Sequence, residues 1–264
     1  MIRAEDIFVV FCPGTTLERI ALRGVNFKIS EGEIVSISGN NGCGRSTLLR
    51  FLAGHINSNF GRLWFNKLDL TGQSFSERSK IFSTVFYDCD TGSAKNLTVA
   101  ENLTMASLHH QHRSLLTPAM NKEMRDMFYE QLRELDFMEM EELLDEKVCN
   151  ITKAHRQVLA LLIAVIKEAK VLLIDEHSTG LDLESAAALH EVTEKIIKSK
   201  KMTTIMAVSD QKFAMSISDR ILILNRGQIV GDISGYAKEN LKIEDLFAAF
   251  DFIPQLNGAS IIKG

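Results

Sequence analysis

The sequence feature that most constrains the fold is a glycine-rich segment, residues 39–47 (GNNGCGRST), between two apolar stretches. Residues 33–38 (EIVSIS) are typical of a β-strand, and the pattern STLLRFLA that stops at Gly54 is typical of an apolar helix. Glycines in this arrangement let successive backbone N–H groups wrap around an anion, and the following helix N-terminus favours negative charge. We therefore predict a phosphate-binding loop made of Gly39, Asn40, Asn41, Gly42, Cys43, Gly44, Arg45, Ser46 and Thr47. The alternative is a glycine-rich turn without a ligand.

One position departs from the usual loop pattern G-x-x-x-x-G-K-S/T, because Arg45 replaces the lysine. Arginine keeps the positive charge, but its guanidinium is planar and larger, so it acts less well as a point charge against phosphates. The hydroxyl of Ser46 is expected to bind Mg²⁺. Cys43 permits two interpretations, an oxidation-sensitive thiol or a small neutral side chain at a variable loop position.

A second informative segment, residues 171–176 (VLLIDE), is typical of a buried parallel strand that ends in two carboxylates. Open α/β sheets bind ligands at the C-terminal ends of their strands, which is where Asp175 would lie. We expect Asp175 to hold the hydration shell of Mg²⁺ and Glu176 to polarise an attacking water. Together with the loop, this segment predicts a site for phosphoryl transfer.

Strand-like and helical patterns alternate along most of the 264 residues, which predicts an α/β core. Helical periodicity dominates from about residue 97 to residue 167, where one amphipathic segment carries an apolar stripe. The stripe consists of Met124, Met127, Phe128, Leu132 and Leu135. We expect it to pack in the core, with a sticky partner surface as the alternative. No low-complexity linker interrupts the chain, so a single domain, residues 1–264, with a helical insertion is predicted.

Composition argues against several functional classes. The longest apolar run, Val158–Ile166, is much shorter than the about 20 residues needed to cross a bilayer, and charges near Met1 argue against a signal peptide. A net charge of −4 without a basic stripe argues against a nucleic-acid partner. The four cysteines lack C-x-x-C spacing, which favours reduced thiols. A cluster of three histidines lacks carboxylate or cysteine partners at ligand spacing, so a solvated surface is favoured over a metal site at His109, His110 and His112.

These motifs resemble the nucleotide-binding subunits of ABC transporters over nearly the whole chain. Residues 18–54 (ERIALRGVNFKISEGEIVSISGNNGCGRSTLLRFLAG) look like the family's opening, residues 97–103 (LTVAENL) like the segment after its glutamine loop, and residues 173–182 (LIDEHSTGLD) like Walker B plus D-loop. The resemblance implies a P-loop NTPase of the ABC type, with an antiparallel β subdomain and a helical subdomain at about residues 97–167.

A narrower resemblance comes from His177, which stands where most of these ATPases have proline. With residues 11–16 (FCPGTT) and 232–247 (DISGYAKENLKIEDLF), it is similar to the ATPases paired with tryptophan/tyrosine-type substrate-binding lipoproteins. The family resemblance further implies that Phe11 stacks on adenine and that Asp182 contacts a partner subunit. The alternatives are a core phenylalanine for Phe11 and a helix N-cap for Asp182, and both roles of Asp182 can coexist.

Several motif positions depart from the family pattern. Tyr87 stands at the glutamine-loop position, and Ser209 stands where the switch histidine is expected. The signature Leu-Ser-Gly-Gly-Gln is replaced by residues 151–155 (ITKAH), in which only Thr152 keeps a hydroxyl. We expect the side chains of Lys153 and Ala154 to occupy the space that two glycines leave open for the opposite subunit's γ-phosphate. Because each lost contact costs on the order of 10²–10³ in rate, efficient hydrolysis by this chain alone is not expected.

The resemblance implies a subunit that couples Mg-ATP binding and hydrolysis to solute transport, with weak ATPase activity of its own. The implied partners are a membrane-spanning permease subunit, a second nucleotide-binding subunit in a homo- or heterodimer, and a substrate-binding lipoprotein. The implied location is cytoplasmic, peripheral to the inner or plasma membrane. Two alternatives stay open: an inactive regulatory or structural subunit paired with a competent paralogue, and a non-transport ABC-type ATPase.

Overall fold

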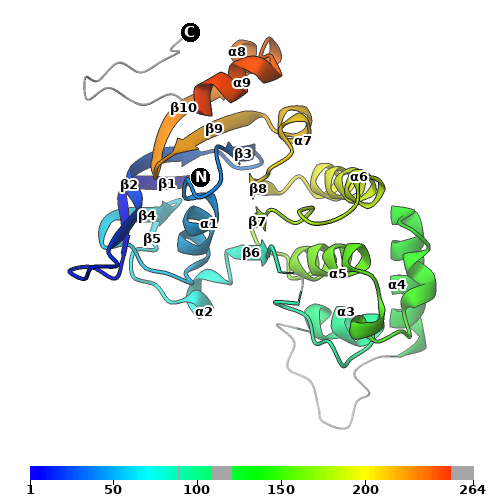
Figure 1. Ribbon diagram of the computed structural model, residues 1–264. Coiled ribbons are helices and arrows are strands. Elements are labelled where there is room, and N and C mark those ends of the chain that lie inside the picture. The colour runs from blue at the N-terminus through cyan, green and yellow to red at the C-terminus, as the bar shows by residue number, and fades with distance from the viewer. Residues whose placement is uncertain (89, 109–120, 251–264) are drawn as a thin grey trace.

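The computed structural model describes residues 1–88, 90–108 and 121–250, and it contains two sheets flanked by helices (Figure 1). The antiparallel sheet has the order β2-β1-β4-β5 and the six-stranded sheet has the order β10-β9-β3-β8-β7-β6. In the larger sheet β9, β3, β8, β7 and β6 run parallel, and β10 pairs antiparallel with β9. This architecture confirms the α/β fold with an added antiparallel sheet.

The strands of the antiparallel sheet are β1 (Ile2–Phe11), β2 (Arg19–Ile29), β4 (Phe60–Phe65) and β5 (Leu68–Asp69). Those of the larger sheet are β3 (Ile34–Ser38), β6 (Phe82–Val85), β7 (Val171–Asp175), β8 (Thr203–Ala207), β9 (Arg220–Asn225) and β10 (Gln228–Ser234). The α-helices are α1 (Arg45–Ala53), α2 (Phe75–Arg78), α3 (Val99–Ser107), α4 (Lys122–Leu135), α5 (Lys153–Ile166), α6 (Leu183–Lys200), α7 (Gln211–Ile217), α8 (Gly235–Glu239) and α9 (Ile243–Phe250). Two 3₁₀ turns, η1 (Met140–Leu143) and η2 (Val148–Asn150), lie between α4 and α5.

Strand β7, which lies between β8 and the edge strand β6, shows why an uninterrupted apolar run was needed. All its residues are buried, and because side chains alternate across a strand, Val171 and Leu173 pack with α1 while Leu172 and Ile174 pack with α5 and α6. The strand is therefore covered by helices on both faces, and its carboxyl end points at the phosphate loop.

Helix α1, which carries the phosphate loop at its N-terminus, is held firmly at its other end. Gly54 adopts a left-handed conformation, and its N–H closes the last turn on the carbonyl of Phe51. The buried guanidinium of Arg78 donates to the carbonyls of Phe51 and Leu70. Its positive charge lies at the negative end of the helix dipole, which stabilises the helix. The first turn of α1 contains no acidic residue, which leaves its N-terminus open to an anion.

The helices α3, α4 and α5 lie together beside the β6 edge of the large sheet, within the range where helical periodicity was expected (Figure 1). Phe128 and Leu132 of α4 are 1% exposed, so the predicted stripe does pack in the core. The inclusion of Met127 was wrong, because this residue lies at the solvent edge of the stripe and is 44% exposed. The sequence analysis also did not predict β10 or α7.

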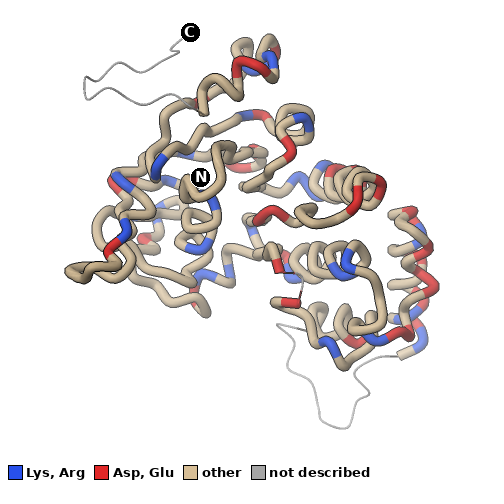
Figure 2. The backbone as a smooth tube through the Cα atoms, in the orientation of Figure 1, with Lys and Arg blue, Asp and Glu red and all other residues tan. Residues whose placement is uncertain are grey.

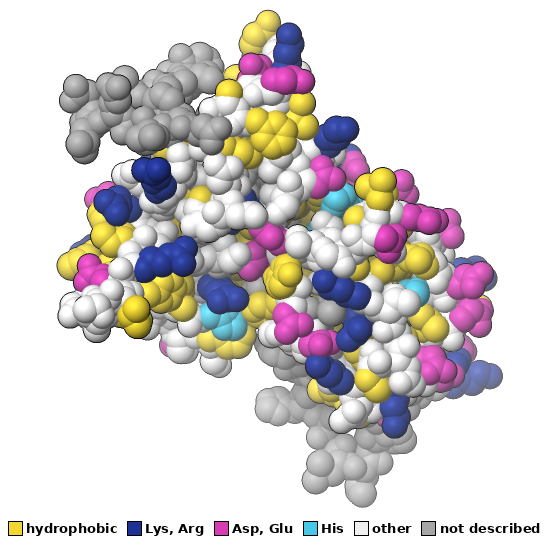
Figure 3. All heavy atoms as spheres, in the orientation of Figure 1, with side chains coloured by type: hydrophobic (Ala, Val, Ile, Leu, Met, Phe, Trp, Pro, Cys, Tyr) yellow, Lys and Arg dark blue, Asp and Glu magenta, His cyan; other side chains and the backbone are white. Residues whose placement is uncertain are grey.

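Basic and acidic residues are interspersed along the described chain (Figure 2). On the face seen in Figure 3, they are scattered among apolar side chains rather than gathered by sign. Among the described residues, none of the helices combines the length and the apolar character needed to cross a bilayer. In the same part of the chain, no group of three potential His, Cys, Asp or Glu ligands could hold a metal ion. The cluster His109, His110 and His112 lies outside the described residues.

Candidate functional site

The glycine-rich loop follows β3 and is held between β2 and β9. Gly39 has φ 148°, and a Cβ there would lie 2.1 Å from the carbonyl oxygen of Leu224. Gly44 has φ 116°, and a Cβ there would lie 2.7 Å from the carbonyl oxygen of Ala21. No other residue type fits these two positions without moving the neighbouring backbone, which explains the glycine spacing.

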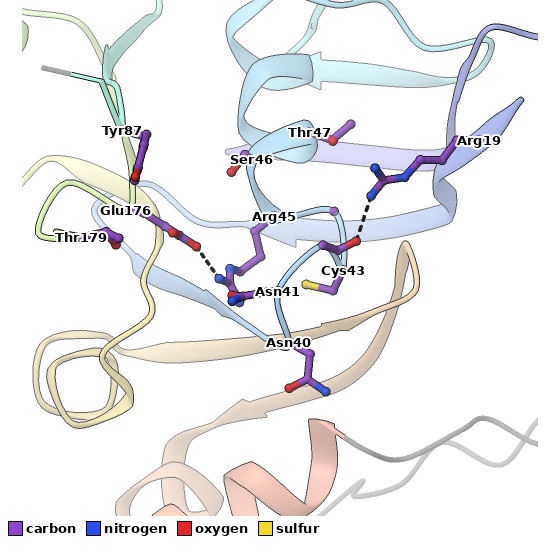
Figure 4. A pocket seen from close by; sticks show the side chains of 12 residues that line it. Arg19, Asn40, Asn41, Cys43, Arg45, Ser46, Thr47, Tyr87, Glu176 and Thr179 are labelled. Carbon is purple, nitrogen blue, oxygen red and sulfur yellow. Dashed lines mark hydrogen bonds and ion pairs between the residues drawn. The ribbon is translucent and has the colours of Figure 1, made fainter. Parts of the chain in front are cut away.

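A cavity opens over this loop, and side chains from three other parts of the chain reach it (Figure 4). Two of the expected residues outside the loop, Tyr87 and Glu176, line the cavity together with the loop itself. The full lining is Arg19, Asn40, Asn41, Gly42, Cys43, Gly44, Arg45, Ser46, Thr47, Tyr87, Glu176 and Thr179. Of these residues, Arg19 and Thr179 were not predicted from the sequence.

Ser46 and Asp175 meet at the end of β7, as expected of a shared metal site. Ser46 Oγ donates a hydrogen bond of 2.8 Å to Asp175 Oδ1. Burial raises the pKa of Asp175, whose carboxylate is 4% exposed, and the Ser46 hydrogen bond opposes this effect. A hydroxyl and a carboxylate side by side are the oxygen donors that Mg²⁺ prefers, and the adjoining cavity leaves room for coordinated water. The residues present therefore fit Mg²⁺.

Arg45 is the member of the loop whose direction the sequence did not predict. Its guanidinium donates to the carbonyl of Gly39 and forms an ion pair with Glu176. The same group lies 3.5 Å from Ser209 Oγ, so the switch position also faces this arginine. The Arg45 side chain is only 6% exposed, which means that its charge is directed into the protein rather than toward the solvent side of the cavity.

Glu176 is positioned by an unusual backbone conformation. Its φ is 46°, in the left-handed region, and its N–H donates to the carbonyl of Ala207 at the end of β8. The carboxylate is thereby turned from the tip of β7 toward the loop, where Arg45 meets it. Strained backbone of this kind persists when surrounding contacts fix it, and it concentrates at functional sites.

Residues 151–155, at the signature position, do not line the cavity of their own chain. Thr152 caps α5 by accepting from the N–H of His155 (3.3 Å), and Lys153 Nζ donates to the carbonyl of Thr179 (2.8 Å). The Lys153 ammonium also lies 5.7 Å from the ring centroid of Tyr87. The expectation that the Ala154 side chain occupies space left open for the opposite subunit's γ-phosphate was wrong, because Ala154 is 3% exposed and packs in the core.

Two further expected residues lie outside the cavity lining. Phe11 ends β1 with 40% of its surface exposed, so it is not a core side chain, and it pairs with Arg19 in the β1–β2 ladder. Asp182 caps α6 by accepting from the N–H of Ser185 (2.9 Å), which confirms the helix-cap alternative. A contact of Asp182 with another subunit stays a prediction. Hydrogen bonding by the backbone N–H and the side chain of Ser185 lowers the pKa of Asp182.

Cys43 is 5% exposed within the loop. Burial raises the pKa of its thiol, against an opposing effect of Arg45. A buried neutral thiol is a poor redox sensor, so the geometry favours the interpretation of Cys43 as a small neutral side chain.

Next to Glu176, His177 is fully buried, and burial lowers its pKa to about 3. This histidine is therefore neutral at physiological pH.

Comparisons with known proteins identify the family to which this chain belongs. The sequence profile of the family described as ABC transporter matches residues 22–179. The tyrosine transport ATP-binding protein of Clostridioides difficile (strain R20291) is 32% identical over 91% of this chain and 92% of that protein. The spermidine/putrescine import ATP-binding protein of Mesoplasma florum is 28% identical over 80% of this chain, and the match spans about half (56%) of that relative's length.

Solved structures agree on the fold. A dimeric ATP-binding cassette in a post-hydrolysis state, bound to ADP and phosphate, superposes with a TM-score of 0.75 at 20% identity, over 89% of this chain and 98% of that one. A nucleotide-free cassette from an ABC transporter gives 0.72 at 20% identity, over 94% and 95%. The fold and site define a P-loop ATPase of the ABC type. The chain belongs to the ABC transporter family, within its ATP-binding proteins.

Proposed function

We propose that this chain is the ATP-binding subunit of an ABC importer and that it binds Mg-ATP but hydrolyses it slowly on its own. The observation that supports slow hydrolysis is the ion pair between Arg45 and Glu176. It joins the residue at the phosphate-loop lysine position to the residue at the water-polarising position. Each partner is thereby engaged in a contact that excludes its expected role.

Binding of the nucleotide is supported by the loop geometry. The backbone N–H groups of residues 42–47 and the N-terminus of α1 would hold the phosphates, while Ser46 and Asp175 would hold Mg²⁺. When bound, Mg²⁺ neutralises charge on the phosphate oxygens. Phe11, exposed at the end of β1, would stack on the adenine ring.

Slow turnover is supported by three side chains at or near the cavity. Glu176 is held in an ion pair with Arg45, so its carboxylate is directed at a guanidinium instead of an attacking water. Ser209 is too short to reach a terminal phosphate as histidine does, and Tyr87 offers a phenol where an amide oxygen is usual. Removing one preorganised contact typically costs on the order of 10²–10³ in rate, and several are altered here.

The site is proposed to be completed by a second nucleotide-binding subunit, in a heterodimer with a competent paralogue. Thr152 and Asp182 are exposed and stand outside the cavity of their own chain, which suits contacts across a dimer. We further propose that the partner is a membrane-spanning permease and that the subunit acts at the cytoplasmic face of the membrane. The whole chain is proposed to form one ABC-type domain with a helical subdomain at about residues 97–167.

The solute is proposed to be an aromatic amino acid or an analogue, because a relative that matches nearly end to end is named for tyrosine transport.

The same ion pair favours a second candidate, a subunit that binds ATP as a regulatory ligand and does not hydrolyse it. The two candidates differ only in turnover when the partner is present. A role outside transport gains no support from the relatives, which are named for transport or import.

The test is equilibrium binding of Mg-ATP to the purified chain, with Ser46→Ala as the control, followed by an ATPase assay with and without the co-expressed partner subunits. We expect binding that the Ser46 variant weakens, little hydrolysis by the chain alone, and faster hydrolysis in the complex. Brisk turnover by the isolated chain would overturn the proposal of a weak site. Binding with no hydrolysis even in the complex would select the regulatory candidate.

A further inference from the structure

Arg45, the cation of the phosphate loop, is already engaged in contacts within the protein. Its guanidinium donates to Gly39, pairs with Glu176 and faces Ser209. Nucleotide phosphates carry several negative charges, and sites for them combine backbone N–H groups with a cationic side chain. Among the described residues that line the cavity, the other cationic side chain is Arg19.

Arg19 reaches the cavity from β2, outside the loop. Its side chain is exposed, and its guanidinium donates to the carbonyl of Gly42 over 3.3 Å (Figure 4). A guanidinium has five N–H donors in a planar fork, so one group can hold the Gly42 carbonyl and an anion together. Figure 4 shows Arg19 and Thr47 on one side of the loop and Glu176 with Tyr87 on the other.

The neighbour of Arg19 indicates which part of the nucleotide it would meet. Arg19 is directly paired with Phe11 in the antiparallel ladder, and side chains of directly opposed residues project from the same face of a sheet. Phe11 is the residue proposed to stack on adenine, whereas Glu176 marks the end where the terminal phosphate would react. Arg19 therefore stands between the nucleoside and the loop, at the α-phosphate end.

We propose that Arg19 is a nucleotide-binding residue that supplies to the α-phosphate end the positive charge that Arg45 directs to Glu176. The inference rests on the proposed function, because it requires the cavity to bind a nucleotide. It adds a residue that the loop motif does not contain. It also explains how the loop can keep affinity for nucleotide although its own arginine faces inward.

The experiment compares Mg-ATP and Mg-ADP binding by the full chain with Arg19→Ala, Arg19→Gln and Arg19→Lys. The control is Arg23→Ala, an exposed arginine of the same strand that does not line the cavity. We expect Arg19→Ala and Arg19→Gln to weaken both ligands by roughly tenfold to a hundredfold, the effect of one charge-assisted hydrogen bond to phosphate. The factor is expected to be similar for ATP and ADP, because both carry the α-phosphate. Arg19→Lys recovers part of the affinity, and Arg23→Ala stays within about twofold of the wild type.

The glutamine variant separates charge from side-chain polarity, because glutamine keeps a polar amide but carries no positive charge. Unchanged affinity of Arg19→Gln and Arg19→Ala, in a wild-type chain that binds ATP, would overturn the inference and leave the proposed function standing. A loss confined to ATP would move Arg19 to the terminal phosphate and would likewise overturn it. If the wild-type chain and Ser46→Ala both fail to bind ATP, the proposed function itself fails, and the inference falls with it.

Discussion

Arg45 and Glu176, which are 131 positions apart in the sequence, form an ion pair in the wall of the cavity beside the phosphate loop. The arginine comes from the first residue of α1 and the glutamate from the left-handed residue after β7. The pair is largely shielded from solvent, with 6% and 18% of the two side chains exposed. Screening by water is therefore limited, and the pair fixes the direction of both groups more firmly than a surface pair does.

The first prediction concerns Arg45→Lys, which restores the usual loop residue. A lysine ammonium is compact and flexible, so it can leave Glu176 and approach the β- and γ-phosphates. We expect Mg-ATP to bind about tenfold more tightly, and ATP hydrolysis in the assembled complex to rise by about the same factor. Equilibrium binding and a steady-state ATPase assay measure the two effects.

The matched control for this prediction is Glu176→Gln, in the wild-type chain and in the Arg45→Lys chain. Glutamine loses the charge of the ion pair and cannot act as a base, so hydrolysis should not rise although binding still does. An Arg45→Lys chain with unchanged affinity and unchanged turnover would show that the ion pair does not limit the site.

The second prediction concerns the cost of burying Asp175. Burial raises the pKa of this carboxyl, so the folded state holds the proton more tightly than the unfolded state. Stability is therefore lost as the pH rises through the unfolded pKa toward the folded pKa, because burial makes the charged form of the carboxyl costly in the folded state. Asp175→Asn can keep the Ser46 hydrogen bond without the charge. We expect its Tm at pH 7 without nucleotide to be higher than that of the wild type, while Mg²⁺ no longer strengthens ATP binding.

Scanning calorimetry measures the Tm, and titration calorimetry with and without Mg²⁺ measures the effect of the ion on ATP binding. A lower Tm for Asp175→Asn would mean that the carboxylate makes stabilising contacts beyond Ser46. Retained Mg²⁺ dependence would mean that another group holds the ion. Ser46→Ala, which removes the hydrogen bond but keeps the buried charge, is expected to lower the Tm.

The phosphate loop and the end of β7 were predictable because local sequence determines both. Gly39 and Gly44 occupy backbone positions where a Cβ would collide with the neighbouring chain, and such positions leave a fixed spacing in the sequence. The inward direction of Arg45 was not predictable, since it depends on where the left-handed backbone of Glu176 directs a carboxylate. Arg19 gave no local signal, because only the antiparallel sheet brings β2 next to the loop. The burial of Ala154 was likewise not predictable, because it depends on which face of α5 packs in the core, and a sequence motif does not contain that information.

The third prediction concerns Lys153, which ties the start of α5 to the segment after β7. Its ammonium donates to the carbonyl of Thr179, and a side chain at Gly180 would meet the same ammonium at 2.9 Å. We expect Lys153→Ala to lose about 1 kcal/mol of stability, a Tm decrease of roughly 2–4 °C, and to speed amide exchange in residues 177–181. Lys170→Ala, at an exposed lysine just before β7, is the control and should change neither quantity. Unchanged exchange in the Lys153 variant would contradict a role in holding this segment.

The last prediction concerns the pH dependence that His177 gives to folding. Thr193 donates its hydroxyl proton to the carbonyl of Leu189, so the imidazole must donate through Nε2 to Thr193 Oγ1 (2.8 Å). This leaves Nδ1 buried without a partner among the described residues, and a proton there would be desolvated. Burial accordingly lowers the pKa of His177 to about 3, whereas the unfolded residue titrates near its usual value of about 6.5.

Between these two pKa values the unfolded chain binds the proton and the folded chain does not, so stability falls as the pH drops below about 6.5. His177→Gln can keep the donor to Thr193 but cannot titrate. From pH 8 to pH 5, the wild type should therefore lose about 2 kcal/mol more stability than the variant. Urea unfolding of both proteins at the two pH values measures the difference, and other acid effects cancel because they are common to both chains. An equal loss in the two proteins would mean that His177 titrates alike in the folded and unfolded chains.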